Sequence, residues 1–329
     1  MKTDEATGAL VPFDFSGIYE EFPSLKRLNV DIEVFTIKPP IDSSNVSVEN
    51  WVDMARIIRD NYSRYDGFVI LHGTDTMSYS ASALSFMLEI LAKPVIFTGN
   101  QIPIGILRTD GRENLITAIE IAGARNDEGN PIVPEVALYF QNRLFRGNRT
   151  TKFSAEALNA FASFNYSALA DVGVNIQYNT PYIAPYAPDF FYDFRISESM
   201  CNDIVVVKLF PGIRPETLRA MVLEAGARGV VLETYGAGNA PTSEWFVDII
   251  KEATSRGIIV VNVSQCKDGA VQMHLYETGL ALQEAGVVSG HDMTIEAAVT
   301  KLMYVLGKNL PLSETLGLMR RPLRGEFTL

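Results

Sequence analysis

Residues 68–77 read Phe68-Val69-Ile70-Leu71-His72-Gly73-Thr74-Asp75-Thr76-Met77. The first four residues form a short, continuous apolar run, as in a strand of a sheet that is covered on both faces. Gly73 permits a sharp turn, and a helical pattern follows through Ala81, Leu84 and Leu88. The stretch therefore predicts a buried β-strand, a polar turn at its carboxyl end and a helix behind the turn.

The alternation of apolar runs and helical patterns continues along the rest of the chain. The further candidate strands are residues 95–97, 136–140, 204–207, 230–232 and 258–261. Because helical patterns separate these runs, they favour parallel pairing with helices on both faces. We therefore predict the α/β class, with a mostly parallel sheet flanked by helices in a larger N-terminal domain and a smaller α/β C-terminal domain.

A proline-rich segment marks the boundary between the two domains. Residues 179–188 carry prolines at 181, 185 and 188 and show no hydrophobic period, which is typical of a linker. We predict an N-terminal domain over residues 1–178, a linker over 179–202 and a C-terminal domain over 203–329. The length agrees, since roughly 150 residues for each domain is the usual expectation.

Composition and charge exclude several classes of protein. The chain has 329 residues, of which 47% are hydrophobic and 20% are charged, as in globular proteins. Lys and Arg number 28 against 39 Asp and Glu, a net charge of −11 that would repel a nucleic-acid backbone. No apolar run approaches the roughly 18–20 residues that a bilayer span needs. We therefore expect neither a nucleic-acid partner nor a membrane.

Cysteine and histidine usage bears on the compartment and on metals. The two cysteines, Cys201 and Cys266, form no CxxC motif, so they exclude a disulfide framework and favour the reducing cytoplasm. His72, His274 and His291 lie far apart in sequence, and we expect no metal site. The glycine-rich residues 236–241 lack the third glycine of a dinucleotide fingerprint, so they are weak evidence for a nucleotide.

Two polar clusters are candidates for chemistry. Thr74 and Asp75 follow strand 68–71, at the end of a strand where α/β proteins bind ligands, although Thr and Asp also cap helices. The second cluster is Asp42-Ser43-Ser44-Asn45, before the helical pattern at residues 51–65. It is either a turn or cap, or a carboxylate and hydroxyl set that holds the ammonium and carboxylate of an amino acid.

A basic loop follows strand 136–140. It carries four cations in an acidic protein: Arg143, Arg146, Arg149 and Lys152. One interpretation is a solvated basic face that pairs with surface carboxylates. The other places one lysine beside Asp75, where it helps to activate a hydroxyl that is almost never ionised at neutral pH. The residues alone leave both interpretations open.

At residues 72–77 the sequence resembles the cytoplasmic (type I) bacterial L-asparaginases. Further matching segments occur in the family's order and spacing. They are Asp42-Ser43-Ser44, residues 67–72, Leu84-Ser85-Phe86-Met87-Leu88-Glu89, residues 146–152, residues 235–241 and Leu323-Arg324-Gly325-Glu326. The resemblance covers essentially the whole chain, and the combination of motifs is specific.

The resemblance implies an amidohydrolase that converts L-asparagine to L-aspartate and ammonia without a metal or an organic cofactor. By that resemblance Thr74, Asp75 and Lys152 match a catalytic triad, in which Lys152 and Asp75 polarise the Thr74 hydroxyl. The positions that match substrate ligands are Asp42, Ser43, Gly73, Asn100 and Asn239. Asn239 matches a residue that a neighbouring subunit contributes, so the resemblance also implies a homodimer or a homotetramer.

The resemblance further implies a candidate second asparagine site, which some type I members use for regulation. Gln101, Thr151 and Cys266 match parts of this allosteric site. Glu233 stands where an allosteric relative carries an arginine, and this difference argues against regulation.

The family pattern begins with a β-strand and a Thr-Gly-Gly-Thr-Ile-Gly loop whose second threonine is the nucleophile. Met1-Lys2-Thr3 matches the residues that follow that loop, so the sequence as written lacks the nucleophile. We therefore expect Met1 to be an internal methionine of a longer protein, and the chain as given to be inactive and poorly soluble. Two alternative functions stay open. One is an asparagine-binding protein without turnover, and the other is an amidase that feeds ammonia to a tRNA-dependent amidotransferase.

Overall fold

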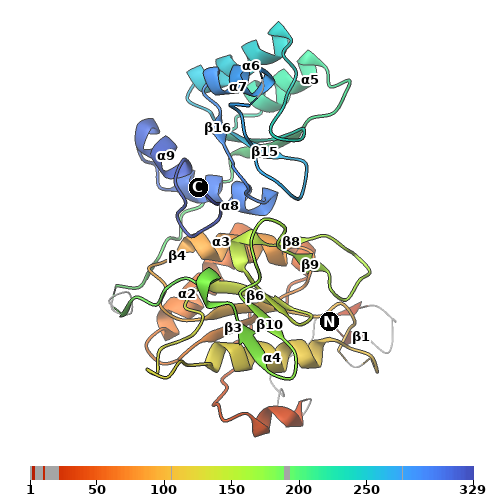
Figure 1. The fold of residues 1–329 in the computed structure, drawn as a ribbon, viewed down its shortest axis with the longest axis vertical. Helices are drawn as coiled ribbons and strands as arrows, with labels where there is room; N and C mark the ends of the chain where they lie inside the picture. Colours follow the sequence, from red (N-terminus) through yellow and green to blue (C-terminus); the bar gives the residue numbers. More distant parts are fainter. Residues whose placement is uncertain (1, 4–9, 12–21, 105, 189–192, 276) are drawn as a thin grey trace. The chain divides into compact units, whose positions relative to one another are not determined.

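The computed structural model describes residues 2–3, 10–11, 22–104, 106–188, 193–275 and 277–329 (Figure 1). The chain divides into unit 1, Met1–Ser163 with Ser167–Ile196, and unit 2, Phe164–Tyr166 with Ser197–Leu329. The predicted linker contains the short helix η5 (Thr180–Tyr182) and strand β12 (Arg195–Ile196). The domain limits at 178 and 203 stay a prediction, and Met1 lies outside the described residues.

Unit 1 is built on a six-stranded sheet in the order β11-β10-β7-β6-β5-β3. The strands are β3 (Phe68–Leu71), β5 (Val95–Thr98), β6 (Val136–Phe140), β7 (Arg143–Arg146), β10 (Ala170–Val172) and β11 (Ile176–Tyr178). The pairs β3–β5 and β5–β6 are parallel, whereas β7, β10 and β11 pair antiparallel. The α/β class is confirmed, with a mixed sheet in unit 1.

The antiparallel half begins at a two-residue turn between β6 and β7. Gln141 and Asn142 both have positive φ, of 45° and 68°. Two such residues give the backbone a twist that matches the strands of a tight hairpin. The loop predicted over residues 141–152 therefore contains a strand, because the chain reverses immediately and pairs with β6 instead of crossing over a helix.

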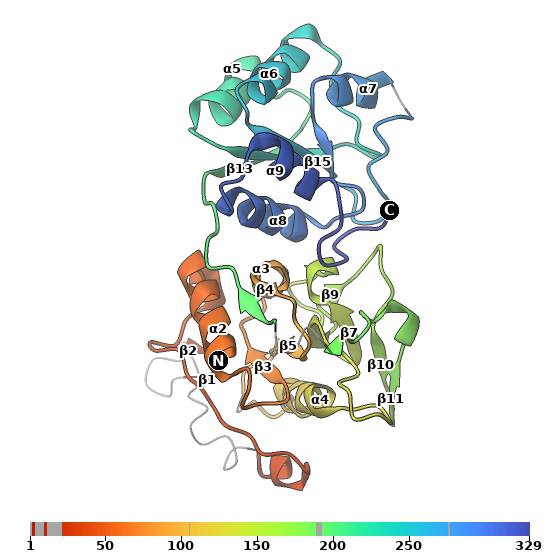
Figure 2. The same cartoon turned by 90° about the vertical axis from the view of Figure 1, so that its left-hand side faces the viewer.

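Helices cover both faces of this sheet, which explains why its central strands are continuous apolar runs. The helices are α2 (Val48–Asn61), α3 (Met77–Met87) and α4 (Gly111–Gly123). Helices α3 and α4 lie on opposite faces of the sheet, and α2 lies beside α3 (Figure 2). Ten of the eleven residues of α3 are buried.

The remaining elements of unit 1 are short. They are β1 (Lys2–Thr3), β2 (Leu10–Val11), η2 (Pro23–Arg27), η3 (Ser43–Asn45), β4 (Leu88–Glu89), η4 (Gly147–Arg149), β8 (Thr151–Lys152) and β9 (Phe161–Ala162). They form three two-stranded pairs, β1–β2, β4–β12 and β8–β9, all antiparallel. The pair β8–β9 positions Lys152, as described below.

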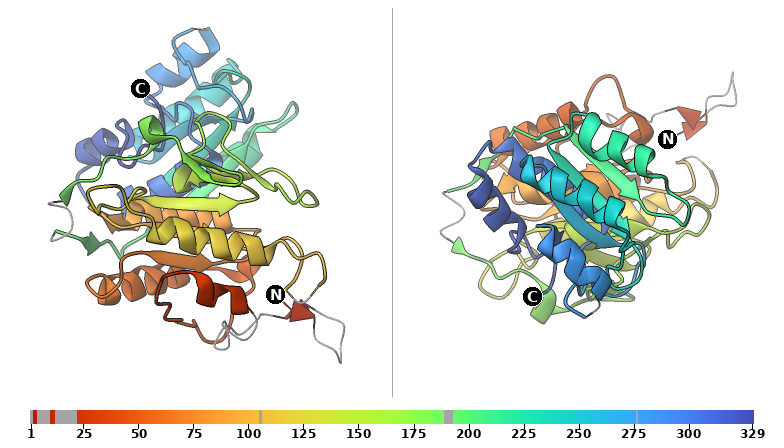
Figure 3. Two further views of the ribbon diagram at one scale, coloured as in Figure 1. Left: turned by 60° about the horizontal axis from the view of Figure 1, so that its bottom comes forward. Right: turned by 90° about the horizontal axis from the view of Figure 1, so that it is seen from above.

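Unit 2 is a parallel four-stranded sheet in the order β13-β14-β15-β16. Its elements are β13 (Ile204–Lys208), α5 (Pro215–Arg219), η7 (Ala220–Glu224), β14 (Gly229–Thr234), α6 (Glu244–Ser255), β15 (Ile259–Ser264), α7 (Glu277–Glu284), β16 (Val288–Ser289), α8 (Ile295–Gly307) and α9 (Leu312–Met319). Helices α5 and α6 cover one face of the sheet and α8 covers the other (Figures 1 and 3). This is the predicted smaller α/β domain.

A fully buried ion pair anchors the C-terminal segment of unit 2 to α8. Lys301 Nζ lies 2.6 Å from Glu326 Oε1, and both side chains are 0% exposed. The lysine also donates to the carbonyl oxygens of Met319 and Arg321, at 3.0 and 2.7 Å. Burial lowers the pKa of Lys301, and the charge of Glu326 opposes that shift. Removing one partner would leave an uncompensated charge in the core.

We therefore expect Lys301→Met to lower the free energy of unfolding by about 3–5 kcal/mol, the usual effect of breaking a buried pair. Lys251→Met removes an exposed lysine of α6 and is the matched control, expected to change stability by less than about 0.5 kcal/mol. Urea denaturation measures both variants. Equal stability of the two variants would contradict the stabilising role of the pair.

Candidate active site

The carboxyl ends of β3 and β5 meet at one edge of the unit 1 sheet because the two strands run parallel. The backbone N–H of His72 donates to the carbonyl oxygen of Thr98 at 2.9 Å, which extends the pairing beyond β3. A Cβ on Gly99 would lie only 2.3 Å from the His72 carbonyl oxygen. Only glycine lets these two strand ends approach so closely, and the turn at residues 72–76 begins at this point.

Lys152 reaches this turn from β8. Its ammonium donates to Thr74 Oγ1 at 2.8 Å and to Asp75 Oδ1 at 2.7 Å. The lysine side chain is 17% exposed, whereas that of Asp75 is 64% exposed. The chain arrives here by passing close over α3, where a Cβ on Gly147 would lie 3.2 Å from the Ala81 carbonyl oxygen. Lys152 thus links Thr74 and Asp75 in one hydrogen-bonded cluster.

The polar segment 42–45 packs against the same turn. Thr76 Oγ1 donates to the Ser43 carbonyl oxygen at 2.6 Å, and a Cβ on Gly73 would lie 2.5 Å from Ser43 Oγ. Asp42 caps η3 by accepting hydrogen bonds from the hydroxyl and the backbone N–H of Ser44, at 2.7 and 2.9 Å. These bonds lower the pKa of Asp42, so its exposed carboxylate is charged at neutral pH. The capping interpretation is confirmed, and the role as a ligand stays a prediction.

A chain of hydrogen bonds supports the turn from behind. The Trp51 indole N–H donates to Ser80 Oγ at 2.8 Å, and Ser80 Oγ lies 2.8 Å from His72 Nε2. His72 Nδ1 lies 2.7 Å from the carbonyl oxygen of Gly73, which can only accept. The neutral imidazole with its proton on Nδ1 satisfies every contact. Burial lowers the pKa of His72, in agreement with that neutral form.

The loop after β5 adds two predicted residues to the neighbourhood. Asn100 donates its side-chain N–H to the carbonyl oxygen of Ile102 at 2.9 Å. Gln101 Oε1 accepts a hydrogen bond from Thr74 Oγ1 at 3.0 Å. From the sequence alone, Gln101 is only a candidate allosteric residue. The parallel pairing of β3 with β5 is the signal that would have placed the two loops side by side.

The remaining residues that the resemblance implies are Thr151, Asn239 and Cys266. Thr151 is buried in β8, directly before Lys152. Asn239 and Cys266 belong to unit 2. Asn239 Oδ1 accepts a hydrogen bond from Thr278 Oγ1 at 2.7 Å, and Cys266 is an exposed free cysteine. The substrate and allosteric roles of these residues stay predictions.

The basic loop is not a solvated face throughout. Arg146 pairs with Glu135 at 2.6 Å, with side chains only 10% and 11% exposed, and Arg149 is 2% exposed. Arg143 alone fits the solvated interpretation, because it pairs with Asp171 on the surface. The interpretation as a solvated face is therefore wrong for Arg146 and Arg149, which are buried in unit 1.

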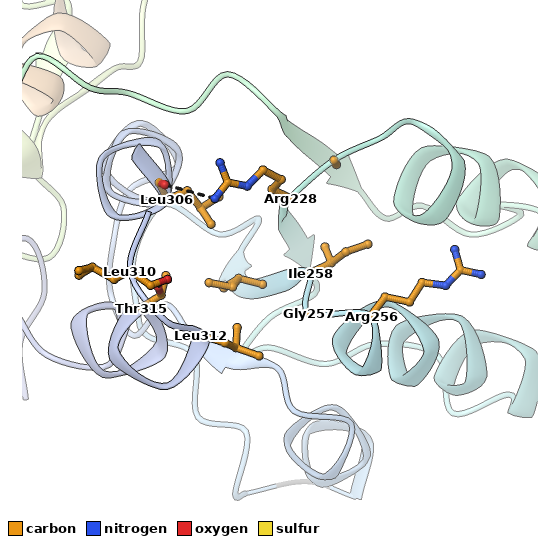
Figure 4. A pocket seen from close by; sticks show the side chains of 10 residues that line it. Arg228, Arg256, Gly257, Ile258, Leu306, Leu310, Leu312 and Thr315 are labelled. Atoms are coloured by element: carbon orange, nitrogen blue, oxygen red, sulfur yellow. Dashed lines mark hydrogen bonds between the residues drawn. The ribbon is translucent and has the colours of Figure 1, made fainter. Parts of the chain in front are cut away.

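A hollow of about 300 Å³ lies in unit 2 (Figure 4). Arg228, Arg256, Leu310 and Leu312 are among its lining residues, at the amino ends of β14 and β15. Arg256 pairs with Glu252, and Arg228 donates to the Asn309 side-chain oxygen at 3.2 Å. None of the candidate site residues named from the sequence lines this hollow, so it is not the candidate active site.

Two features are absent from the described part of the chain, a metal-binding cluster and a helix that could span a membrane. No cluster of three His, Cys, Asp or Glu side chains within it is arranged to hold a metal ion. Within the same residues, no helix is long and apolar enough to cross a membrane.

The fold and the polar cluster at the ends of β3 and β5 define an α/β protein with a candidate hydrolytic site. Residues 1–184 match the family model for the asparaginase N-terminal domain, and residues 203–319 match the glutaminase/asparaginase C-terminal domain. The chain therefore belongs to the asparaginase family. This result confirms the resemblance drawn from the sequence.

Similarity to individual proteins agrees with this family assignment. The chain is 46% identical to L-asparaginase 1 of Escherichia coli K12 over 299 residues, covering 91% of this chain and 85% of that protein. The structure of L-asparaginase I from Vibrio cholerae superimposes with a TM-score of 0.89 at 40% identity, covering 100% of this chain and 96% of that one. The chain is also 44% identical to the mouse 60 kDa lysophospholipase, covering 90% of this chain and about half (51%) of that protein.

The pKa of His72 predicts an acid sensitivity of unit 1. Its pKa lies below the ordinary 6.5 in the folded protein, so below pH 6.5 the unfolded chain takes up the proton first. Stability should therefore fall as the pH drops from 7 to 5, and His72→Gln should make that fall smaller. His291→Gln is the matched variant in unit 2. Burial also lowers the pKa of His291, so this change should likewise make the loss of stability at low pH smaller. Urea denaturation at each pH measures the effect, and identical slopes for wild type and H72Q would contradict it.

Proposed function

We propose that this protein hydrolyses the side-chain amide of L-asparagine to L-aspartate and ammonia. The observation that carries the proposal is the contact of Lys152 with both Thr74 and Asp75 at the carboxyl end of β3. A hydroxyl needs a neighbouring cation or base before it can take part in acyl transfer, and the ammonium is such a neighbour. The similarity to proteins named L-asparaginases supports the same reaction.

The charge pattern around the turn fits an amino-acid substrate. We place the substrate ammonium on the Asp42 carboxylate, which is exposed and charged at neutral pH. The substrate carboxylate then lies near the Ser43 hydroxyl, and the side-chain amide lies near Gly73 and Asn100. Ser43 is packed tightly against Gly73, so the two ends of the substrate would be held by one rigid pair of loops.

The cluster around Lys152 would move the proton. The attacking oxygen donates a hydrogen bond to the Thr74 oxygen, which the Lys152 ammonium holds in place, and its proton passes on to the amide nitrogen. Asp75 holds the lysine in place through the 2.7 Å ion pair. The amide nitrogen takes up a proton as the C–N bond breaks and leaves as ammonia. Backbone N–H groups at the strand ends are the donors for the developing oxyanion; removing one such donor from a protease oxyanion hole costs about 2.7–4 kcal/mol.

Assembly and location are part of the proposal. We propose a homodimer or a homotetramer in the cytoplasm, in which Asn239 of one copy completes the site of its neighbour. Two unpaired cysteines, Cys201 and Cys266, are compatible with a reducing compartment. A regulatory site that includes Gln101, Thr151 and Cys266 remains a separate prediction. Light scattering at micromolar concentration tests the assembly, and a strict monomer would contradict it.

Ammonia release from asparagine tests the proposed reaction against its alternatives. Ammonia release by the purified protein without any tRNA supports the hydrolase. Binding of asparagine without release favours a binding protein, and release that depends on charged tRNA favours an amidase that supplies an amidotransferase. Calorimetry with asparagine and an ammonia assay on the same sample separate the three outcomes.

The proposed roles predict different kinetic effects for Lys152 and Asp42. Lys152→Met removes the cation that assists proton movement, so kcat should fall by about 10²-fold or more with little change in KM. Asp42→Asn keeps the cap of η3 but removes a charge from the proposed ammonium site, so KM should rise by about tenfold or more. Steady-state ammonia assays measure both. Equal effects of the two changes on kcat and KM would contradict the assignment of roles.

A further inference from the structure

The side-chain amide of Gln101 can face in only one direction. Its nitrogen, Nε2, donates to the carbonyl oxygens of Ala157 and Ala155, at 3.2 and 3.4 Å. Carbonyl oxygens only accept hydrogen bonds, so the NH₂ end must lie on that side. The other end, Oε1, is therefore the atom that lies 3.0 Å from Thr74 Oγ1.

This orientation determines where the Thr74 hydroxyl proton points. An amide oxygen only accepts, so Thr74 donates its single proton to Gln101. The Lys152 ammonium only donates, so one lone pair of Thr74 receives its hydrogen bond at 2.8 Å. With the proton and one lone pair both engaged, the second lone pair of the oxygen stays open to a reactant.

The backbone of Gln101 is held as firmly as its side chain. The Asp110 carboxylate accepts the N–H groups of Gln101 and Ile102, at 3.0 and 2.9 Å. Asn114 donates to Asp110 at 3.1 Å and to the Gly99 carbonyl oxygen at 2.9 Å. Asp110 and Asn114 are 6% and 2% exposed. The loop after β5 is thereby tied to the N-terminus of α4, and Gln101 has little freedom to move away from Thr74.

We propose that Gln101 is a positioning residue for the reaction, which holds the Thr74 proton away from the reacting atoms and leaves a lone pair of Thr74 open. The inference rests on the proposed asparagine hydrolysis. Without this acceptor, the Thr74 hydroxyl would turn its proton toward the exposed Asp75 carboxylate or the reactant, and its lone pair would no longer accept a hydrogen bond from the attacking oxygen. The charged groups around this contact are Lys152, Asp75 and, on the backbone side of Gln101, Asp110.

Two substitutions separate this role from a structural one. Gln101→Met and Gln101→Glu both remove the N–H donors to Ala155 and Ala157, but only Q101E keeps an acceptor for the Thr74 proton. We expect Q101M to lower kcat by about five- to tenfold, as for the loss of one hydrogen bond, with KM within about twofold of wild type. Q101E should keep more kcat than Q101M. Gln177→Met, at an exposed position of β11, is the matched control and should keep wild-type activity.

The pH profile supplies a readout that a structural role would not move. The added carboxylate of Q101E lies one hydroxyl away from the Lys152 ammonium and favours its charged form. The alkaline limb of kcat/KM should therefore shift to higher pH in Q101E and remain in place in Q101M. NMR of ¹³C-labelled lysine should show the Lys152 amine losing its proton at higher pH in Q101E than in wild type, independently of turnover.

Each outcome decides one of the two hypotheses. Equal kcat for Q101M and Q101E, or unchanged pH profiles and lysine titrations, would overturn the positioning role of Gln101. Failure of wild type to release ammonia would contradict the proposed function instead. In that case the lysine titration alone decides whether Gln101 faces the Thr74–Lys152 contact.

Discussion

The candidate site of unit 1 depends on the contact of the Lys152 ammonium with Thr74 and Asp75, because a mostly buried cation must be given acceptors. Lys152 lies on the two-residue strand β8, far along the chain from the turn at residues 72–76 that it contacts. The hairpin at Gln141–Asn142 sends the chain back across the sheet, and Gly147 lets it pass close to α3. The hairpin and the close passage at Gly147 together place the Lys152 ammonium at the carboxyl end of β3.

Two glycines let the loops at this edge of the sheet approach one another closely. Gly73 and Gly99 lie where the loops after β3 and β5 and the segment around Ser43 approach within a distance that a Cβ would block. Close backbone approach leaves the polar side chains of these loops with few alternative positions. A site of this kind is preorganised by packing, which matters because catalytic groups that are already oriented need no rearrangement during the reaction.

Two carboxylates at the site illustrate how local structure separates their roles. Asp42 is held by the N–H and hydroxyl of Ser44, which lower its pKa and keep it charged, as the proposed contact with a substrate ammonium needs. Asp75 is held by Lys152 and so belongs to the cluster that moves protons in the proposed reaction. In the proposed reaction the same residue type thus takes a binding role in one loop and a catalytic role in another, because its hydrogen-bond partners differ.

The sequence by itself determined the α/β class, because apolar runs such as residues 68–71 and 136–140 alternate with helical periods. It also determined the family, through motifs spread over the whole chain, and it named every residue of the Thr74 cluster. It did not reveal that Gln101 contacts Thr74, nor that Arg146 and Arg149 are buried, nor that the sheet turns antiparallel at β7. Those facts depend on which strands are neighbours and on where the chain reverses, and both are set by long-range packing that no local pattern encodes.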